Sequence, residues 1–330
     1  MSEIIPSNNK FCCIAFQNAG CETRGSRIQL QDGLSVHTGS PLELAKHWQE
    51  WLGTIHSKRL HDSNFAILAC APSLSTGDEH KRLERIAYGF LYALFMQGVP
   101  WYEGGLVVSG ASIESEIEAH SVGDLKRFYR IPGVQPNYIL NQSINTAGTV
   151  AKGIRYVFSE TGSFERVRRG IHAWIRAIQE REAQNRLHQF VRSVEALVKP
   201  EISRTQRQFS HRCQTFVGAS DQARRLLWEF YDLRSASEHM NGWEFYLEQV
   251  LKSERDREAS LRAYQAELLA SQVYTKLLSS QALLRVFETD ESIEKFWMLQ
   301  DGERKTLWGD TIDLETLAAA HFQCPAGVPC

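Results

Sequence analysis

The spacing of hydrophobic positions changes near residue 160. Before that point, short apolar runs bounded by polar residues or glycine predict strands at 11–16, 65–71 and 105–111. Longer stretches with apolar residues three or four positions apart predict helices at 41–60 and 79–98. Turn-forming residues over 131–148 predict a long loop. This order permits an α/β or an α+β arrangement, so we expect a mixed α/β domain over 1–160.

From residue 161 to 330, the pattern is helical almost throughout. Apolar positions at helical spacing predict helices over 164–180, 185–199, 201–217, 221–240, 243–287 and 290–300. Pro200 ends the second of these and Gly218 the third, while Ser220 or Asp221 caps the start of the fourth. We therefore expect a separate all-helical domain over 161–330.

Composition narrows the protein class only slightly. The chain has 330 residues and is 43% hydrophobic, which is enough for two domains with real cores. No apolar run approaches the roughly 18–20 residues that span a bilayer, and the first residues lack the basic and apolar pattern of a signal peptide. Seven scattered cysteines suit free thiols in a reducing compartment. We expect a cytoplasmic protein without a membrane segment.

Charge is unevenly distributed along the chain. Residues 164–234 hold thirteen arginines and one lysine against eight acidic residues, although the whole chain has a net charge of −2. Guanidinium groups match the geometry of phosphate oxygens. The alternative is that these arginines lie on solvated helix faces and pair with nearby glutamates.

One charged residue interrupts the apolar stripe of the fourth helix. Leu226, Leu227, Phe230 and Tyr231 recur at helical spacing, and the next position on that stripe is Arg234. His239 follows five residues later, just before the turn-forming pair at 241–242. A purely structural interpretation pairs Arg234 with Asp232, Glu229 or Glu238 and lets His239 end the helix.

The stretch LLWEFYDLRSASEHMNG, with the long helical pattern and FETDESIEKFW after it, resembles the HEPN superfamily and specifically its ApeA-like branch. FVRSVEALV and RQFSHR also resemble earlier helices of that domain. The similarity spans about 184–300. The fold class that we expect is therefore α+β overall, with an N-terminal mixed α/β domain and a C-terminal all-α HEPN bundle.

The resemblance implies a metal-independent endoribonuclease that acts as a homodimer, with two motifs facing each other across a two-fold axis. It assigns catalysis to Arg234 and His239, with Ser235 assisting. RNA would be the substrate, and we take four arginines of the same domain as its binding residues: Arg207, Arg212, Arg224 and Arg225. Some members are modified on a tyrosine two residues after the histidine, where this chain has Asn241.

The chemistry is consistent with these residue types. When a 2′-hydroxyl attacks the adjacent phosphorus, histidine suits the proton transfers and a permanent guanidinium suits the extra negative charge. Five residues of regular helix rotate by about 500°, so Arg234 and His239 lie about 140° apart. Either the helix loosens at Ser235–Glu238, where SASE could form a capping box, or a partner subunit supplies the missing group.

Other chemistry is less favoured. The sequence contains no glycine loop for phosphates, and His37, His47, His56 and His61 are spread over different elements. His321, Cys324 and Cys330 do not fit a standard zinc spacing. We expect no metal and no cofactor.

The role of such nucleases as toxins or antiviral-defence effectors follows from the resemblance alone, as do an antitoxin or a small-molecule trigger as further partners. The N-terminal domain would be a sensor or regulatory module. The main alternative is a catalytically silent HEPN dimer that acts as a scaffold, adaptor or ligand-sensing module.

Overall fold

The computed structural model describes residues 4–22, 26–73, 78–114, 116–135 and 138–322. Its chain divides into two compact units, one comprising 1–127 and 136–155 and the other 128–135 and 156–330. The division falls inside a helix, between Arg155 and Tyr156, and the short segment 128–135 belongs with the helical unit. The protein is α+β: an antiparallel sheet with helices comes first, and a mostly helical region follows.

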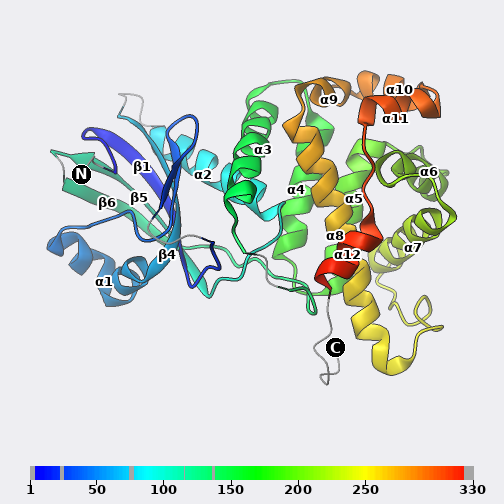
Figure 1. Ribbon diagram of the computed structural model, residues 1–330, viewed down its shortest axis with the longest axis horizontal. Helices are drawn as coiled ribbons and strands as arrows, with labels where there is room; N and C mark the ends of the chain where they lie inside the picture. The colour runs from blue at the N-terminus through cyan, green and yellow to red at the C-terminus, as the bar shows by residue number, and fades with distance from the viewer. Residues whose placement is uncertain (1–3, 23–25, 74–77, 115, 136–137, 323–330) are drawn as a thin grey trace. The chain divides into compact units, whose positions relative to one another are not determined.

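The first unit is built on a six-stranded sheet in the order β2-β3-β4-β1-β5-β6, and each neighbouring pair of strands is antiparallel (Figure 1). Its strands are β1 Asn9–Gln17, β2 Arg27–Gln29, β3 Leu34–His37, β4 Ser63–Pro72, β5 Gly104–Ile113 and β6 Glu116–Asp124. Its helices are α1 Lys46–His61, α2 Glu79–Phe95 and the first part of α3 Asn141–Ser159. The three strands predicted from apolar runs are confirmed as β1, β4 and β5.

The central strands are apolar on both faces because helices cover both faces. Phe11, Cys13 and Ala15 of β1 pack in one core with Leu52 and Leu60 of α1. The alternate residues face the other way, where the Phe16 ring lies 6.4 Å from the ring of Phe95 of α2. Burial on both faces explains why these strands are continuous apolar runs. Cys12 and Cys13 accordingly lie on opposite sides of the sheet.

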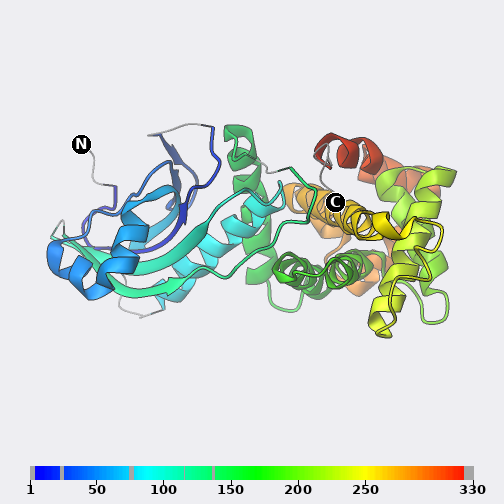
Figure 2. The ribbon, with the colours of Figure 1, turned by 90° about the horizontal axis from the view of Figure 1, so that it is seen from below.

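The second unit is a helical assembly in which α5 Ala183–Val198 packs against α4 Glu165–Gln179, α7 Asp221–Glu238 and α8 Arg255–Ser279. Helix α6 Thr205–Val217 lies beside α7 (Figures 1 and 2). Shorter elements complete it: η1 Lys252–Glu254, α9 Gln281–Val286, α10 Asp290–Met298, α11 Asp301–Trp308 and α12 Leu314–His321. The described residues contain no helix that is both long and apolar enough to cross a membrane.

Two sequence predictions are wrong about where helices begin, and three elements were not predicted at all. The helix expected from residue 243 begins only at Arg255, because Trp243 and Leu247 are buried in a series of turns instead. The loop expected over 131–148 ends at Asn141, where α3 begins and buries Ile144 and Ala147. The edge strand β6 and the helices α11 and α12 were not predicted, because β6 buries a single residue and each of the two helices has only eight residues.

We expect a 161–330 fragment to fold but to be less stable than a 126–330 fragment. The fully buried Arg186 donates hydrogen bonds to the carbonyl oxygen of Tyr129 and to the carboxylate of Glu267. Loss of Tyr129 leaves this guanidinium with an unmet donor, which costs about 1–3 kcal/mol. Urea denaturation of both fragments measures the difference. Equal stabilities would show that 128–135 does not belong to the folded unit. The domain boundary near 160 has a separate test: if limited proteolysis of the full chain gives no cut between 130 and 170, the boundary is wrong.

Candidate functional site

Helix α7 carries the residues on which the functional hypothesis depends. It begins as predicted, with the Ser220 hydroxyl accepting a hydrogen bond from the backbone N–H of Ala223 at 3.0 Å. Its buried stripe packs Leu227, Phe230 and Leu233 into the helical unit. His239 is the C-terminal cap of the helix. The next residue, Met240, has a left-handed backbone with φ of 55°, and there the chain leaves the helix.

Arg234 lies between α7 and α5, and its side chain is only 14% exposed. One guanidinium nitrogen lies 3.2 Å from a carboxylate oxygen of Glu195, and another forms an ion pair with Glu238. The guanidinium carbon is 5.5 Å from the centre of the Tyr231 ring. The Arg234 Nε is buried and has no hydrogen-bond partner among the described residues. The pairing with Glu238 confirms part of the structural interpretation of this arginine.

Of the two alternatives for bringing Arg234 and His239 together, the loosening of the helix at Ser235–Glu238 does not occur. Helix α7 is continuous to Glu238, and within that stretch the Ser237 hydroxyl donates back to the carbonyl oxygen of Leu233 at 3.0 Å instead of capping a new helix. Trp243 donates to the same hydroxyl and so fixes the chain after the helix. Within one chain, Arg234 therefore points toward α5, while His239 is exposed at the helix end.

Two residues of α5 belong to this site although sequence reasoning missed them. Burial raises the pKa of the Glu195 carboxyl, and the Arg234 guanidinium opposes part of that shift. His188 lies with its Nδ1 3.4 Å from the carbonyl oxygen of Arg234, and burial lowers the pKa of its imidazole. The seven-residue spacing of His188 and Glu195 places both on one helix face, which is the only sequence signal that could have linked them.

The exposed face of α7 carries a line of functional groups. Trp228, Ser235 and His239 are spaced by seven and four residues, which returns to nearly the same side of a helix. Trp228 is 44% exposed and His239 is exposed. Eleven residues separate them, or about 16 Å along the axis. Asp232 lies on the same side and accepts a hydrogen bond from Gln206 at 2.6 Å.

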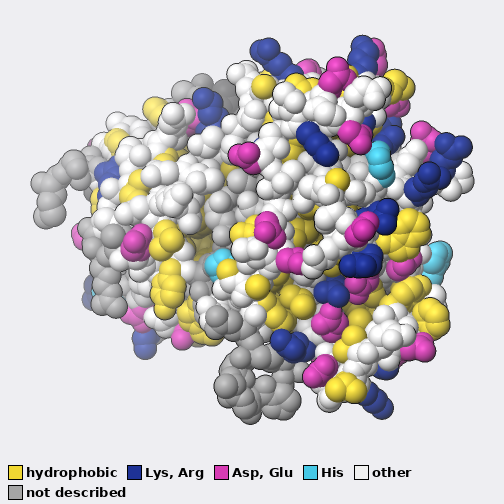
Figure 3. Space-filling model, turned by 45° about the vertical axis from the view of Figure 1, so that its right-hand side comes forward, with side chains coloured by type: hydrophobic (Ala, Val, Ile, Leu, Met, Phe, Trp, Pro, Cys, Tyr) yellow, Lys and Arg dark blue, Asp and Glu magenta, His cyan; other side chains and the backbone are white. Residues whose placement is uncertain are grey.

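Three of the four predicted RNA-binding arginines lie in one groove. Arg207 of α6 and Arg224 and Arg225 of α7 line an open groove of about 540 Å³ together with His211 and Trp228. On the face that Figure 3 presents, Lys and Arg side chains lie among hydrophobic and acidic ones. The structure therefore brings the unforeseen Trp228 into the group of predicted RNA-binding residues.

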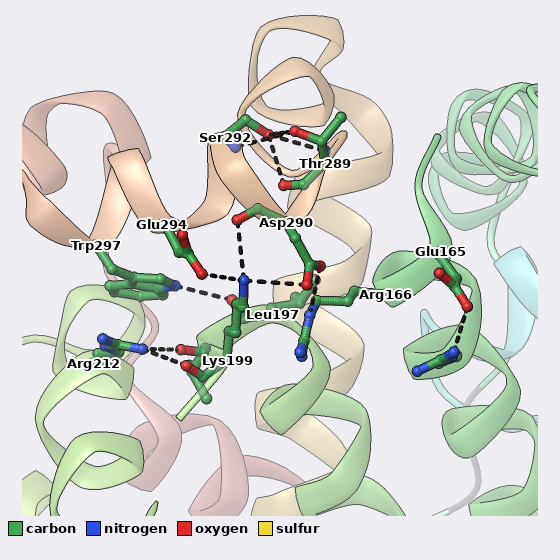
Figure 4. A network of polar contacts seen from close by, with 12 residues as sticks. Glu165, Arg166, Leu197, Lys199, Arg212, Thr289, Asp290, Ser292, Glu294 and Trp297 are labelled. Carbon is green, nitrogen blue, oxygen red and sulfur yellow. Dashed lines mark hydrogen bonds and ion pairs between the residues drawn. The ribbon is translucent and has the colours of Figure 1, made fainter. Parts of the chain in front are cut away.

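The fourth arginine, Arg212, lies at a different place (Figure 4). It donates hydrogen bonds of 2.6 Å to the carbonyl oxygens of Val198 and Lys199, the last residues of α5 and its cap. Its guanidinium lies 5.4 Å from the ring of Trp297, which itself donates to the carbonyl oxygen of Leu197. Since these hydrogen bonds stabilise a helix end, we no longer count Arg212 among the RNA-binding residues.

Replacing Arg212 with alanine is expected to lower the free energy of unfolding by about 1.5–3 kcal/mol, because hydrogen bonds from a charged group are lost. The matched control is Arg169→Ala, which removes an exposed i,i+4 pair with Glu165 and should cost about 1 kcal/mol or less. Urea denaturation measures both values. An Arg212 variant of unchanged stability but weakened RNA binding would return this residue to the RNA surface.

Exposed apolar side chains surround the end of α7. Met240 is 95% exposed and Phe245 is 75% exposed, and Tyr246 and Leu251 follow in the same turn-rich segment. The rings of Phe245 and Tyr246 contact each other, with their centres 5.4 Å apart. Clustered exposed apolar residues are typical of surfaces that bind other proteins. Trp243 and Leu247 anchor the segment to the core from beneath.

No metal-ligand set is found in the described part of the chain: no three or more His, Cys, Asp or Glu side chains are grouped so that they could hold an ion. Cys324 and Cys330 lie outside the described residues. Within them, Cys12, Cys13, Cys70 and Cys213 carry free thiols.

Comparison with known proteins adds no relative: no protein-family model, no curated protein and no solved structure matches the chain.

Proposed function

We propose that this protein is a metal-independent endoribonuclease of the HEPN type. The observation that carries the proposal is the exposed face of α7, where His239 and Ser235 lie in line with Trp228 and the arginine-lined groove. A general acid–base group thus lies on the same surface as groups suited to bind an RNA strand.

In the proposed reaction, the 2′-hydroxyl of the substrate attacks the neighbouring phosphorus. His239 exchanges protons with the attacking or leaving oxygen, because an imidazole ring can both accept and donate a proton. Arg234 stabilises the negative charge that develops on the phosphorane oxygens. Ser235 lies between these functions on the helix and would hydrogen-bond to the phosphate.

The direction of the Arg234 side chain favours a composite site. Arg234 and His239 diverge on a continuous helix, so one subunit does not direct both at the same phosphate. A second copy, packed across a two-fold axis, would bring its own α7 end to the first. The exposed Met240 and Phe245 supply apolar surface for such a contact.

A second candidate function is a catalytically silent HEPN dimer that serves as a scaffold, adaptor or ligand-sensing module. The observation that favours it is the pairing of Arg234 with both Glu195 and Glu238, which already neutralises the guanidinium. In the nuclease, a phosphate would have to displace the more exposed Glu238 carboxylate, which is 46% exposed.

The experiment that separates the two is incubation of the purified protein with total RNA in EDTA, followed by analysis of the fragment ends. The nuclease yields fragments that end in 2′,3′-cyclic phosphate without added metal, and the scaffold leaves the RNA intact. Cleavage that occurs only with added metal would contradict the proposed mechanism. A role as a toxin or antiviral-defence effector predicts that expression slows growth.

A further inference from the structure

The groove between α6 and α7 combines a flat aromatic side chain with unpaired positive charge. The two helices are joined by the short segment 218–220, so they run side by side as a helical hairpin. The Ser210 hydroxyl donates to the carbonyl oxygen of Arg224 at 3.3 Å, and the Phe209 ring lies 5.8 Å from the Tyr231 ring. These contacts give the groove a fixed floor.

Within the part of the chain that the structure describes, two of the three arginines in this groove have no ion-pair partner. Arg207 and Arg225 are exposed, and neither lies within ion-pairing distance of a carboxylate among the described residues. Arg224 pairs with Asp221, and because both side chains are well exposed this ion pair is weak. Arg169, by contrast, is paired on its own helix. The groove thus offers free guanidinium groups that match phosphate oxygens.

Trp228 supplies a different kind of binding surface. Its neighbours Leu226 and Leu227 are buried, whereas the Trp228 side chain is 44% exposed beside the arginines. An indole face stacks on the flat face of any nucleobase, and such stacking with nearby cations is typical of single-strand binding. A volume of about 540 Å³ is of the size that holds one small organic group such as a nucleotide.

We infer that this groove holds one nucleotide of a single-stranded RNA, with its base stacked on Trp228 and its flanking phosphates bound by Arg207 and Arg225. Stacking on a side chain requires an unpaired base, so a duplex is a poor ligand. A strand held here continues along α7 toward Ser235 and His239, about 16 Å away. Only this direction toward a reaction centre rests on the proposed function; binding itself does not.

One acidic residue lies on that path and gives a test of its direction. Asp232 is between Trp228 and His239 on the same helix face, and its carboxylate accepts a hydrogen bond from Gln206. Burial raises the pKa of this carboxyl, yet a charged Asp232 would repel passing phosphates. Asp232→Asn keeps the hydrogen bond and removes the charge, so it should tighten binding of a long strand and leave binding of AMP unchanged.

The binding test uses the full chain with His239→Ala in every sample, so that cleavage does not consume the probe. Fluorescence anisotropy compares a labelled single-stranded oligoadenylate with a labelled RNA hairpin, and AMP serves as a competitor. Trp228→Ala is expected to weaken single-strand binding by roughly tenfold or more, whereas Trp228→Phe retains most of it. Trp51→Ala, which removes an exposed tryptophan of α1, is the matched control and should have no effect.

Salt dependence separates the two kinds of contact. Arg225→Ala should reduce the slope of log affinity against log salt by about 0.7, while Trp228→Ala should weaken binding at an unchanged slope. Arg169→Ala should change neither quantity. If AMP competes as well as a strand of equal nucleotide concentration, the site binds free nucleotides and the inferred strand path is overturned.

The inference fails if the wild-type groove binds no RNA, if the hairpin binds as tightly as the single strand, or if Trp228→Ala binds like its parent. These outcomes are independent of cleavage. Trp228-dependent binding without any RNA cleavage by the wild-type protein would refute the proposed nuclease and uphold the groove. RNA cleavage by the wild-type protein together with unaltered binding in the Trp228 and Arg225 variants would support the nuclease and refute the groove.

Discussion

Replacing His239 with alanine is expected to reduce ribonuclease activity by at least about a hundredfold, and Arg234→Ala by a comparable or larger factor. The His239 substitution removes a proton-transfer group. Because this side chain is exposed at the end of α7, folding should be unchanged. Arg234→Lys should recover little, because a point charge does not reproduce two parallel hydrogen bonds. Gel analysis of a defined RNA in EDTA measures each rate, and circular dichroism checks folding.

Glu238→Gln tests whether the observed ion pair competes with the substrate. Glu238 is more exposed than Glu195 and pairs with the same guanidinium. If Arg234 binds phosphate, loss of this competing charge should lower KM and leave folding intact. If the arginine has only a structural role, Glu238→Gln changes no activity.

If Arg234→Ala and His239→Ala cleave RNA as fast as the wild type, the paired motif is structural and the scaffold interpretation replaces the nuclease.

The elements that the sequence predicted well are those whose burial is simple. Strands β1 and β4 are covered on both faces and read as apolar runs, while α4 and α5 show a single buried stripe. Edge strand β6 has one buried residue, Ala119, so its composition is polar and carries no strand signal. The spacing of apolar residues reflects which side chains are buried, so it does not predict an element that buries few of them.

The helix prediction for 243–251 failed although two residues of this segment are buried. Trp243 and Leu247 are four residues apart and buried, which is the spacing of a helix. Their burial comes from turns anchored by the Trp243 indole, which donates to the carbonyl oxygen of Leu233 at 3.2 Å. Phe245 and Tyr246 project outward from those turns. The local sequence pattern does not distinguish a helix from such turns, because the hydrogen-bond acceptor that holds Trp243, Leu233, belongs to helix α7.

The candidate site was likewise only partly predictable. Arg234 was recognisable as a charge on an apolar stripe, but its partner Glu195 lies 39 positions earlier on α5. Arg207, Arg224 and Arg225 could be selected by charge density, and so was Arg212, which caps a helix end instead. Local charge density does not show which guanidinium groups find carbonyl partners once the helices pack.

If the proposed dimer forms through the exposed segment after α7, replacing Phe245 with aspartate is expected to convert it into a monomer and to reduce cleavage by about a hundredfold or more, because an aromatic side chain of the proposed interface is replaced by a charge. Phe245 lies with Met240, Tyr246 and Leu251 on an exposed apolar segment next to His239. Sedimentation velocity at micromolar concentration measures assembly. Met298→Asp, which alters an exposed apolar residue of α10, is the control and should change neither assembly nor rate.

Mixed dimers decide whether Arg234 and His239 come from different subunits. A dimer of one Arg234→Ala chain and one His239→Ala chain has one site that lacks both groups and one site that has both. Random pairing makes half of the dimers mixed, so co-expression should restore about a quarter of wild-type activity, although each variant alone is inactive. Purification through two different tags should raise this to about half. Inactive mixed dimers of normal mass would show that the two residues do not act across the subunit boundary, and a wild-type monomer would remove the composite site altogether.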